Sequence, residues 1–322
     1  MSFIPMRDSL AAVRVLIVGD VMLDEYWFGD VSRISPEAPV PIVHVKRSDE
    51  RPGGGANVAR NVVSLGAQAM LLSVVGADNT AERLRNVLDA AGVQHQLRVD
   101  PSIRTTLKLR LIGQNQQMLR VDFEELPSKE SLESKLLDFE KLLASTDIVV
   151  ISDYGKGVLR RVEELIAIAR CHSKPILVDP KGRDYRRYLG ATAVTPNRSE
   201  LSDAVGGWSD AGDMDAKAEA LRTDLGLAAL LLTMSEQGMK LYRQDHVLHQ
   251  PARASEVYDV SGAGDTVIAA IAVMLGSGQS WEDAVAFANT AAGIAVGKLG
   301  TSIVTLDEVM SAREPLPARE DG

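Results

Sequence analysis

The sequence reads Val260-Ser261-Gly262-Ala263-Gly264-Asp265-Thr266 directly before an apolar run, residues 267–275, which Gly276 follows. An apolar run of this kind predicts a buried helix that ends at the glycine. Glycines at a helix start let backbone N–H groups converge on an anion, and the helix dipole adds positive potential there. Asp265 can take a proton from a hydroxyl while those N–H groups hold the negative charge of a phosphoryl group. The stretch therefore favours phosphoryl transfer to an alcohol.

A second glycine cluster, Gly53-Gly54-Gly55-Ala56-Asn57, lies near the other end of the chain. Successive glycines expose the backbone to a ligand, and the side chain of Asn57 can both donate to and accept from a hydroxyl. The alternative is a tight loop that leads into a helix, with Asn57 near its first turn. The residues alone favour neither interpretation.

Polar residues directly follow several predicted strands, at the edge where open α/β sheets bind their ligands. Asp20 follows the first strand, where a carboxylate suits sugar hydroxyls, and the alternative is a helix or turn cap. Lys156 and Lys181 sit beside glycines immediately after strands, which favours contact with a substrate phosphate.

The stretch Asn197-Arg198-Ser199-Glu200 has the form of a helix start. Asn197 would be the N-cap and Glu200 its partner in a capping box. In the functional interpretation, both side chains hold the hydration shell of a magnesium ion beside the nucleotide phosphates. The sequence does not separate the two interpretations, and both can hold at once.

The composition bounds the class of protein. The chain has 322 residues, of which 45% are hydrophobic, enough for one large α/β domain or two small ones. Acidic residues outnumber basic ones by 44 to 35, and the net charge of −9 argues against a nucleic-acid partner. The single cysteine, Cys171, excludes an internal disulfide, and no apolar run approaches the ~20 residues of a membrane helix. We therefore expect a cytoplasmic protein without a membrane partner.

Predicted strands and helices alternate through most of the chain, which indicates a mostly parallel sheet with helices on both faces. The fold class is therefore α/β, in one domain over residues 1–322, with a polar tail at 313–322 that we expect to be disordered. The predicted strands are residues 13–19, 70–75, 148–152, 175–178, 191–195 and 228–233, and the predicted helices are residues 56–65, 80–91, 158–170, 215–225, 265–275 and 281–297.

Two segments break this alternation and predict a small sheet beside the main one. Residues 26–45 are irregular and rich in proline and glycine, with short β-like pieces. Residues 105–123 alternate apolar and polar side chains on both sides of a turn, as a hairpin does. We expect segments of about 25–48 and 103–124 to pair as a lid. Because a small sheet with one apolar face needs a cover, we expect the active site, a second subunit or both to provide it, and favour a homodimer.

Other functional classes find less support. Residues 293–299 resemble a P-loop but have the wrong spacing and lack Ser or Thr after Lys298. No Gly-x-Gly-x-x-Gly motif follows the first strand, which argues against a dehydrogenase. The five histidines show no metal-ligand spacing, and we place His246 and His249 in a surface hairpin.

Together the two glycine segments resemble the signatures of the ribokinase (PfkB) family of carbohydrate kinases, and the resemblance covers nearly the whole chain. It implies a Rossmann-type three-layer core with a β-sheet lid, ATP, Mg²⁺ and an aspartate base. By that motif Asp265 is the base, and Gly262, Ala263 and Gly264 form the anion hole. The substrate-binding residues are then Asp20, Gly54, Gly55, Asn57, Lys156 and Lys181. The nucleotide-binding residues are Thr195, Asn197, Glu200, Thr233, Ser235, Gly238, Gly262, Gly264, Asn289, Gly293 and Val296, with residues 298–301 on the adenine side and water-mediated Mg²⁺ contacts from Asn197 and Glu200.

Within this family the chain particularly resembles the kinases of D-glycero-β-D-manno-heptose 7-phosphate. The stretches that carry the resemblance are 115–117 with 120–124, 152–158, 179–182 and 296–302. They imply phosphoryl transfer from ATP to the anomeric O1, which gives heptose 1,7-bisphosphate for ADP-heptose and the lipopolysaccharide inner core. No His-x-Gly-His motif of a nucleotidyltransferase is present, so we expect the single-function form.

Two positions depart from the family pattern. Ser235 stands where a glycine is usual, which bears on the nucleotide contacts, and Ala81 replaces a glycine at a helix start. Two alternatives stay open: a kinase of the same fold for another sugar phosphate, such as a fructose or tagatose phosphate, and a catalytically silent sugar- or nucleotide-binding protein. Asp265 and its glycine frame argue against the silent protein.

Overall fold

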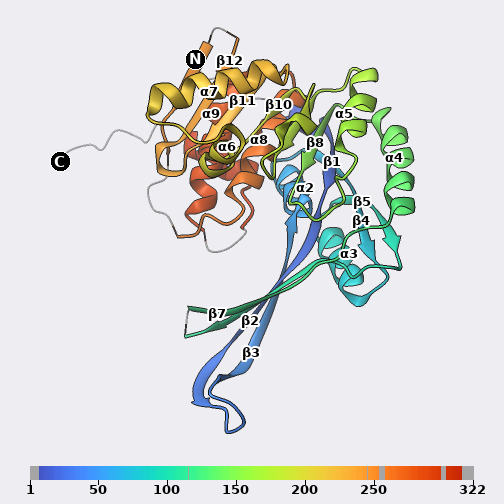
Figure 1. Cartoon of the computed structure of the whole chain (residues 1–322), viewed down its shortest axis with the longest axis vertical. Helices are drawn as coiled ribbons and strands as arrows, with labels where there is room; N and C mark the ends of the chain where they lie inside the picture. Colours follow the sequence, from blue (N-terminus) through green and yellow to red (C-terminus); the bar gives the residue numbers. More distant parts are fainter. Residues whose placement is uncertain (1–6, 115, 245, 254–257, 299–301, 314–322) are drawn as a thin grey trace, which may run out of the picture.

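The computed structural model describes residues 7–313 except 115, 245, 254–257 and 299–301. Its centre is a twisted sheet, which has nine strands within these residues (Figure 1). The strands are β1 (Arg14–Gly19), β4 (Gln68–Gly76), β5 (Gln94–Asp100), β8 (Ile148–Ser152), β9 (Ile176–Asp179), β10 (Ala193–Val194), β11 (Ala229–Thr233), β12 (Met239–Arg243) and β13 (His246–Gln250). The order is β13-β12-β11-β10-β9-β8-β1-β4-β5, and the pairs are parallel except that β12 pairs antiparallel with both β11 and β13. The mostly parallel sheet and the hairpin with His246 and His249 are confirmed.

Alternate residues of the central strands enter two separate cores, one on each face of the sheet. In β1, Ile17 packs into one core, while Leu16 and Val18 pack into the other, and all three are buried. Successive side chains of a strand point to opposite faces, and this sheet is covered on both. Burial on both faces explains why the strand sequences are apolar throughout.

Helices form a layer on each face, so the three-layer α/β core is confirmed. One layer holds α1 (Arg7–Ala11), α2 (Gly55–Ser64), α3 (Asn79–Ala90), α8 (Ala263–Gly276), α9 (Trp281–Val296) and α10 (Leu306–Arg313). The other holds α4 (Lys129–Leu143), α5 (Val162–Cys171), η1 (Tyr185–Tyr188), α6 (Arg198–Val205) and α7 (Ala211–Asp224), and the short η2 (Ser235–Gln237) precedes β12. Among the described helices, none has the length and apolar character needed to cross a bilayer.

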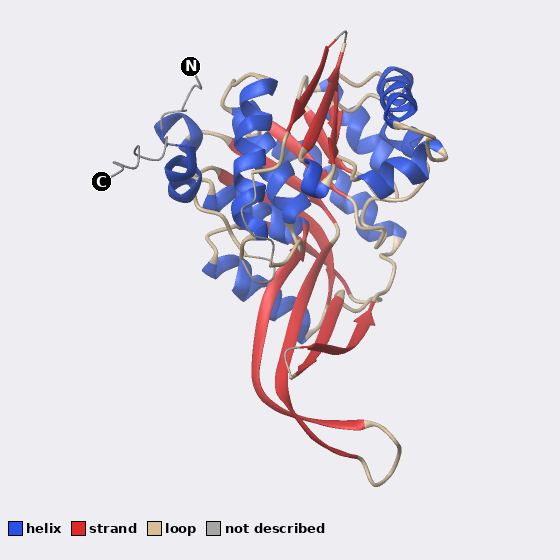
Figure 2. Ribbon diagram, turned by 90° about the vertical axis from the view of Figure 1, so that its left-hand side faces the viewer, coloured by secondary structure: helices blue, strands red, loops and turns tan. Residues whose placement is uncertain are grey.

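A second sheet of four strands projects from this body, in the order β3-β2-β6-β7 (Figure 2). Its strands are β2 (Val21–Ile34), β3 (Pro41–Gly54), β6 (Leu107–Gly113) and β7 (Gln116–Phe123). The predicted hairpin and its pairing with the earlier segment are confirmed. The description of residues 26–45 as irregular was wrong, because β2 and β3 are continuous strands of 14 residues each, with register shifts at two places. Main-chain hydrogen bonds hold β2 and β3 together as a two-stranded ribbon, and much of this ribbon is exposed. The two strands therefore do not need the apolar alternation of a strand with one buried face.

Several element boundaries also differ from the prediction. Helix α7 begins at Ala211, earlier than expected, because Asp210 caps it by accepting from the Asp213 amide. Helix α5 begins at Val162 rather than Val158, since turns occupy residues 158–161. Strand β5 and helix α4 were not predicted. Strand β5 lies at the edge of the sheet, where a largely polar sequence is tolerated.

A buried carboxylate ties the end of β5 to the start of α4. Asp100 is 1% exposed and accepts hydrogen bonds from the Ser102 hydroxyl at 2.6 Å, the Ser102 amide at 3.0 Å and the Ser128 amide at 2.7 Å. Burial raises the pKa of Asp100, but the bonds from Ser102 and Ser128 outweigh burial and hold this pKa well below its usual range. Its contribution to stability is therefore present above the unfolded-state pKa and is lost as the pH falls towards the folded-state pKa.

We expect Asp100→Ala to lower the free energy of unfolding at pH 7 by about 2 kcal/mol, because three hydrogen bonds to a buried carboxylate are lost. Chemical denaturation at pH 7 and pH 3 measures this, and the loss should be smaller at pH 3. Asp224→Ala, at the exposed end of α7, is the control and should change little. Equal stability of the Asp100 variant and the native chain at pH 7 would contradict this account.

Candidate active site

The two glycine-rich segments meet at the carboxyl edge of the main sheet. The first ends β3 and begins α2, and the second begins α8, which packs against α2. Gly262 caps α8 in the left-handed conformation, with φ 79°. Asp265 lies in the first turn of this helix and is 3% exposed.

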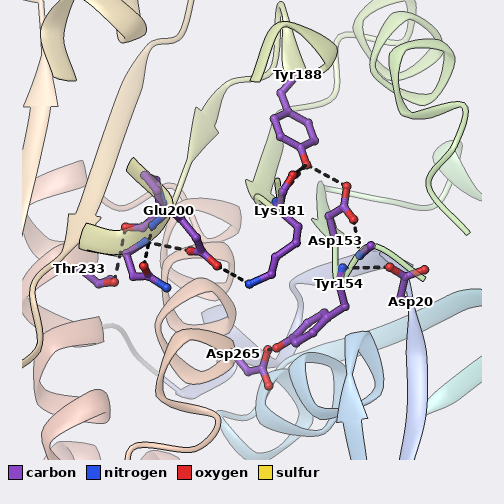
Figure 3. Close-up of polar contacts among 11 residues, drawn as sticks. Asp20, Asp153, Tyr154, Lys181, Tyr188, Glu200, Thr233 and Asp265 are labelled. Atoms are coloured by element: carbon purple, nitrogen blue, oxygen red, sulfur yellow. Dashed lines mark hydrogen bonds and ion pairs between the residues drawn. The ribbon is translucent and has the colours of Figure 1, made fainter. Parts of the chain in front are cut away.

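The carboxylate of Asp265 accepts one hydrogen bond on each oxygen. Asn57 donates from its side-chain amide to Oδ2 at 2.7 Å. The Tyr154 hydroxyl donates to Oδ1 at 2.8 Å (Figure 3). Burial raises the pKa of Asp265 to about 6, against the opposing effect of these two donors. A carboxylate with a pKa near neutrality, held in a fixed orientation, is equipped to accept a proton.

The glycines around this carboxylate differ in what they accommodate. A Cβ on Gly53 would lie 2.5 Å from Asp24 Oδ2, and one on Gly54, whose φ is 61°, would lie 2.5 Å from the Asp20 carbonyl oxygen. Close approach of the chain to itself therefore requires these two glycines, as in the loop interpretation. A Cβ on Gly264 would meet nothing within 4 Å. Neither packing nor a positive φ accounts for that glycine, and the open space beside it suits a ligand.

At the predicted anion hole, the Ala263 amide donates to the Val260 carbonyl at 3.2 Å, which closes the turn before α8. Among the predicted sugar-binding residues, Gly55 donates its amide to the Asp20 carbonyl at 2.9 Å and Asn57 contacts Asp265. Contacts of these residues with a phosphoryl group or a sugar stay predictions.

Asp20 is fully buried and caps the loop that follows β8. Its carboxylate accepts from the backbone amides of Tyr154 and Lys156 at 2.9 Å and of Val158 at 3.0 Å. This contact matches the capping interpretation of Asp20. Binding of sugar hydroxyls by Asp20 stays a prediction.

The two predicted phosphate-binding lysines lie apart and already have acidic partners. Lys156 pairs with Glu124, at the end of the lid, at 2.5 Å. Lys181 pairs with Glu200 at 2.9 Å, and its side chain is half-exposed. Figure 3 shows Lys181 between Glu200 and the pair formed by Tyr154 and Asp265. Because Glu200 is a predicted nucleotide-binding residue, its bond places Lys181 beside the predicted nucleotide side.

The predicted capping box at α6 is present: the Asn197 side chain accepts from the Glu200 amide at 2.9 Å, and Glu200 accepts from the Asn197 amide at 3.1 Å. Asn197 also forms a parallel bridge with Thr233, which places the ends of two strands side by side. Thr195 is buried just before them. In the described part of the chain, no cluster of three or more His, Cys, Asp or Glu side chains is arranged to hold a metal directly.

The remaining predicted nucleotide-side residues lie at η2 or in the C-terminal half of α9. Ser235, where the family pattern has glycine, adopts a left-handed conformation with φ 52°, which explains why glycine is usual there. Gly238 has φ 86° and lies against Gln250, and Asn289 donates to the Pro251 carbonyl at 2.7 Å. Gly293 and Val296 lie in α9, and residues 299–301 fall outside the described residues.

A family model described as pfkB family carbohydrate kinase matches residues 13–308. The chain belongs to this family. It is 56% identical over 302 residues to a D-beta-D-heptose 7-phosphate kinase of Bordetella bronchiseptica, a match that covers 94% of this chain and 96% of that protein. It is 50% identical over 309 residues to the bifunctional protein HldE of Pseudomonas aeruginosa, which covers 96% of this chain and 65% of that protein. The chain thus spans less than two thirds of the length of this bifunctional relative.

Solved structures of a ribokinase and a phosphofructokinase share the fold. The chain superimposes on ribokinase of Arabidopsis thaliana, complexed with ribose and ATP, with a TM-score of 0.76 and 21% identity, covering 93% of this chain and 98% of that one. For phosphofructokinase-2 of Escherichia coli the TM-score is 0.79 at 21% identity, with the same coverage. The ribokinase-like core with a lid is confirmed, and the chain is a carbohydrate kinase.

Sequence reasoning assigned no role to several residues around Asp265. Tyr154 contacts the carboxylate directly, and the charges of Asp24 on β2 and Arg60 on α2 act on it. A local signal existed for Asp24, which interrupts an apolar stretch, and for Tyr154, which follows a strand within a stretch that resembles the family. Neither signal reveals the contact, because the partners lie far apart in the sequence.

We expect Asp265→Asn to lower kcat by at least ~10²-fold with ATP binding nearly intact, since the amide cannot accept the proton. In the native chain, turnover should fall as the pH drops through about 6, because the pKa of Asp265 lies there and only its ionised form is a base. Steady-state kinetics and ATP titration calorimetry measure both effects, with Asp224→Asn as the control. Near-native turnover of the Asp265 variant would remove this residue from the role of base.

Proposed function

We propose that this chain transfers a phosphoryl group from ATP to the anomeric O1 of D-glycero-β-D-manno-heptose 7-phosphate, giving the 1,7-bisphosphate. The buried carboxylate of Asp265, held at 2.7 Å by Asn57 of the other glycine segment, carries the assignment of kinase chemistry. The heptose substrate is supported by the 56% identity to a kinase named for it, over nearly the full length of both chains. The product would enter ADP-heptose synthesis for the lipopolysaccharide inner core, in the cytoplasm.

In the reaction, Asp265 accepts the proton of the anomeric hydroxyl while the oxygen forms a bond to the γ-phosphorus of ATP. The bond from this phosphorus to the bridging oxygen breaks, and ADP leaves. Backbone amides at Gly262 and Gly264, at the positive end of α8, hold the charge that develops on the transferred group, and the Ala263 amide joins them once it leaves the Val260 carbonyl. Asn197 and Glu200 would hold Mg²⁺ through water, and the ion would neutralise part of the phosphate charge.

The inner face of the lid suits an anionic sugar. In the paired strands β2 and β6, Asp24 lies opposite Lys108, so their side chains share one face of the lid. This face points toward Asp265, since the negative charge of Asp24 raises the pKa of Asp265. The positive charge of Lys156 likewise lowers the pKa of Lys108 on this face. Arg110 lies on the same face and binds Asp24 at 2.5 Å. Basic groups beside a catalytic carboxylate favour a sugar phosphate over an uncharged sugar.

A substrate panel tests the proposal. ADP formation should be at least ~10²-fold more efficient, as kcat/KM, with heptose 7-phosphate than with fructose 6-phosphate or tagatose 6-phosphate. Phosphorus NMR should then show a new anomeric phosphate beside the retained 7-phosphate. Faster turnover of another sugar phosphate would favour the alternative kinase. ATP binding without ADP formation on any sugar would favour the silent binding protein.

The outer face of the lid suits a second copy of this chain. It carries Leu107, Leu109 and Leu111 from β6, which lie opposite Phe123, Val121 and Leu119 from β7 in that order. Leu119 is 54% exposed and Phe123 is 36% exposed. Burial of such a face between two identical lids would remove apolar surface from water and give a homodimer.

We expect the native chain to be a dimer in size-exclusion chromatography with light scattering, and Leu119→Glu to shift it toward the monomer, because a charge on the shared face is costly to bury. Leu137→Glu is the matched control, since Leu137 is 62% exposed on α4, away from the lid, and it should leave the dimer intact. A monomeric native chain would contradict the proposed interface.

A further inference from the structure

Tyr154 contacts the catalytic carboxylate but belongs to neither glycine segment. It lies in the loop after β8, and its hydroxyl donates to Asp265 Oδ1 at 2.8 Å (Figure 3). Burial and the nearby carboxylate of Asp265 hold the pKa of Tyr154 well above its usual value. The hydroxyl therefore keeps its proton throughout the working pH range and always offers a donor to Asp265.

The loop that carries Tyr154 is fixed from several sides. Asp20 accepts three backbone amides of the loop, one of them from Tyr154 itself. Asp153 accepts from the Gly155 amide at 2.8 Å, and the fully buried Lys135 donates to the Val158 carbonyl. A change in the path of this loop would break buried hydrogen bonds, so the Tyr154 hydroxyl has a fixed position relative to α8.

A hydrogen bond from Tyr154 favours the ionised form of Asp265, since a carboxylate accepts more strongly than a neutral carboxyl group. Burial and the charge of Asp24 on β2 oppose ionisation, whereas Asn57 and Arg60 on α2 support it. Asp179, at the end of β9, lies close enough that Asp265 contributes to raising its pKa well above the usual value. The ionised form of Asp265 therefore depends on the few groups that stabilise its negative charge, because the carboxylates nearby disfavour it.

We propose that Tyr154 is a positioning residue for the base: its hydroxyl keeps the carboxylate of Asp265 ionised and oriented, and Asp20 acts on the base through the loop that carries Tyr154. This inference rests on the proposed kinase function. It also gives Asp20 a role other than contact with the sugar, consistent with its three backbone bonds.

The test is the pH dependence of kcat/KM for Tyr154→Phe, measured with ATP and whichever sugar phosphate the native chain turns over. Loss of one hydrogen bond to a charged group should move the acid limb of the profile up by ~1 pH unit. The variant should lose about fivefold more activity at pH 6 than at pH 8.5, where the remaining loss reports the orientation of the carboxylate. An unshifted acid limb, or an equal loss at every pH, would overturn the proposal. If the native chain phosphorylates no sugar, the proposed function itself has failed.

Two further variants identify the group that titrates. Tyr188→Phe is the matched control, because its hydroxyl donates to Asp153 at 2.8 Å instead of to Asp265, and it should leave the acid limb in place. In a Tyr154→Phe, Asp179→Asn double variant, the shift should persist. Disappearance of the shift would assign the limb to Asp179 and overturn the proposal.

Asp20→Asn tests the indirect part of the inference. Because asparagine retains the size of the side chain but has one acceptor oxygen instead of two, the loop should loosen and the acid limb should move up as in Tyr154→Phe. A rise of more than tenfold in KM for the sugar, with an unshifted limb, would show instead that Asp20 binds the substrate. Circular dichroism and ATP binding confirm that each variant is folded.

Discussion

The hydrogen bond between Asn57 and Asp265 is the contact on which the rest of this structure depends. It joins the first turn of α2 to the first turn of α8 at 2.7 Å, within the interior of the protein. Two helix starts from distant parts of the chain thereby face the same small volume. The buried carboxylate has a pKa of about 6, so it is ionised at neutral pH and still basic enough to accept a proton.

The two glycine-rich segments look alike in the sequence but meet different physical needs. Gly53 and Gly54 allow the chain to pass within contact distance of Asp24 and of the Asp20 backbone. Gly264 has open space beside it, as the approach of a ligand to a helix start requires. One segment therefore builds the frame that holds Asn57, and the other leaves open space at the start of α8. This division explains why the pair of segments is more informative than either alone.

Much of the core could be predicted from the sequence, because its signals are local or repeat along the chain. The apolar β1, the buried α8 and the Asn197–Glu200 capping box are examples. The long strands β2 and β3 could not be predicted, since an exposed ribbon leaves no apolar alternation. The contact of Tyr154 with Asp265 was also out of reach, because it depends on a loop that Asp20 fixes from far away in the sequence.

The two faces of the lid differ in character, with charged groups toward Asp265 and apolar groups away from it. The central claim is that the acceptor hydroxyl meets Asp265, and a crystal structure of Asp265→Asn with heptose 7-phosphate and a non-hydrolysable ATP analogue tests it most directly. The account predicts that the anomeric oxygen lies within about 2.6–3.2 Å of the side chain at position 265 and in line with the γ-phosphorus. An anomeric oxygen that contacts another carboxylate instead, such as Asp24, would contradict it.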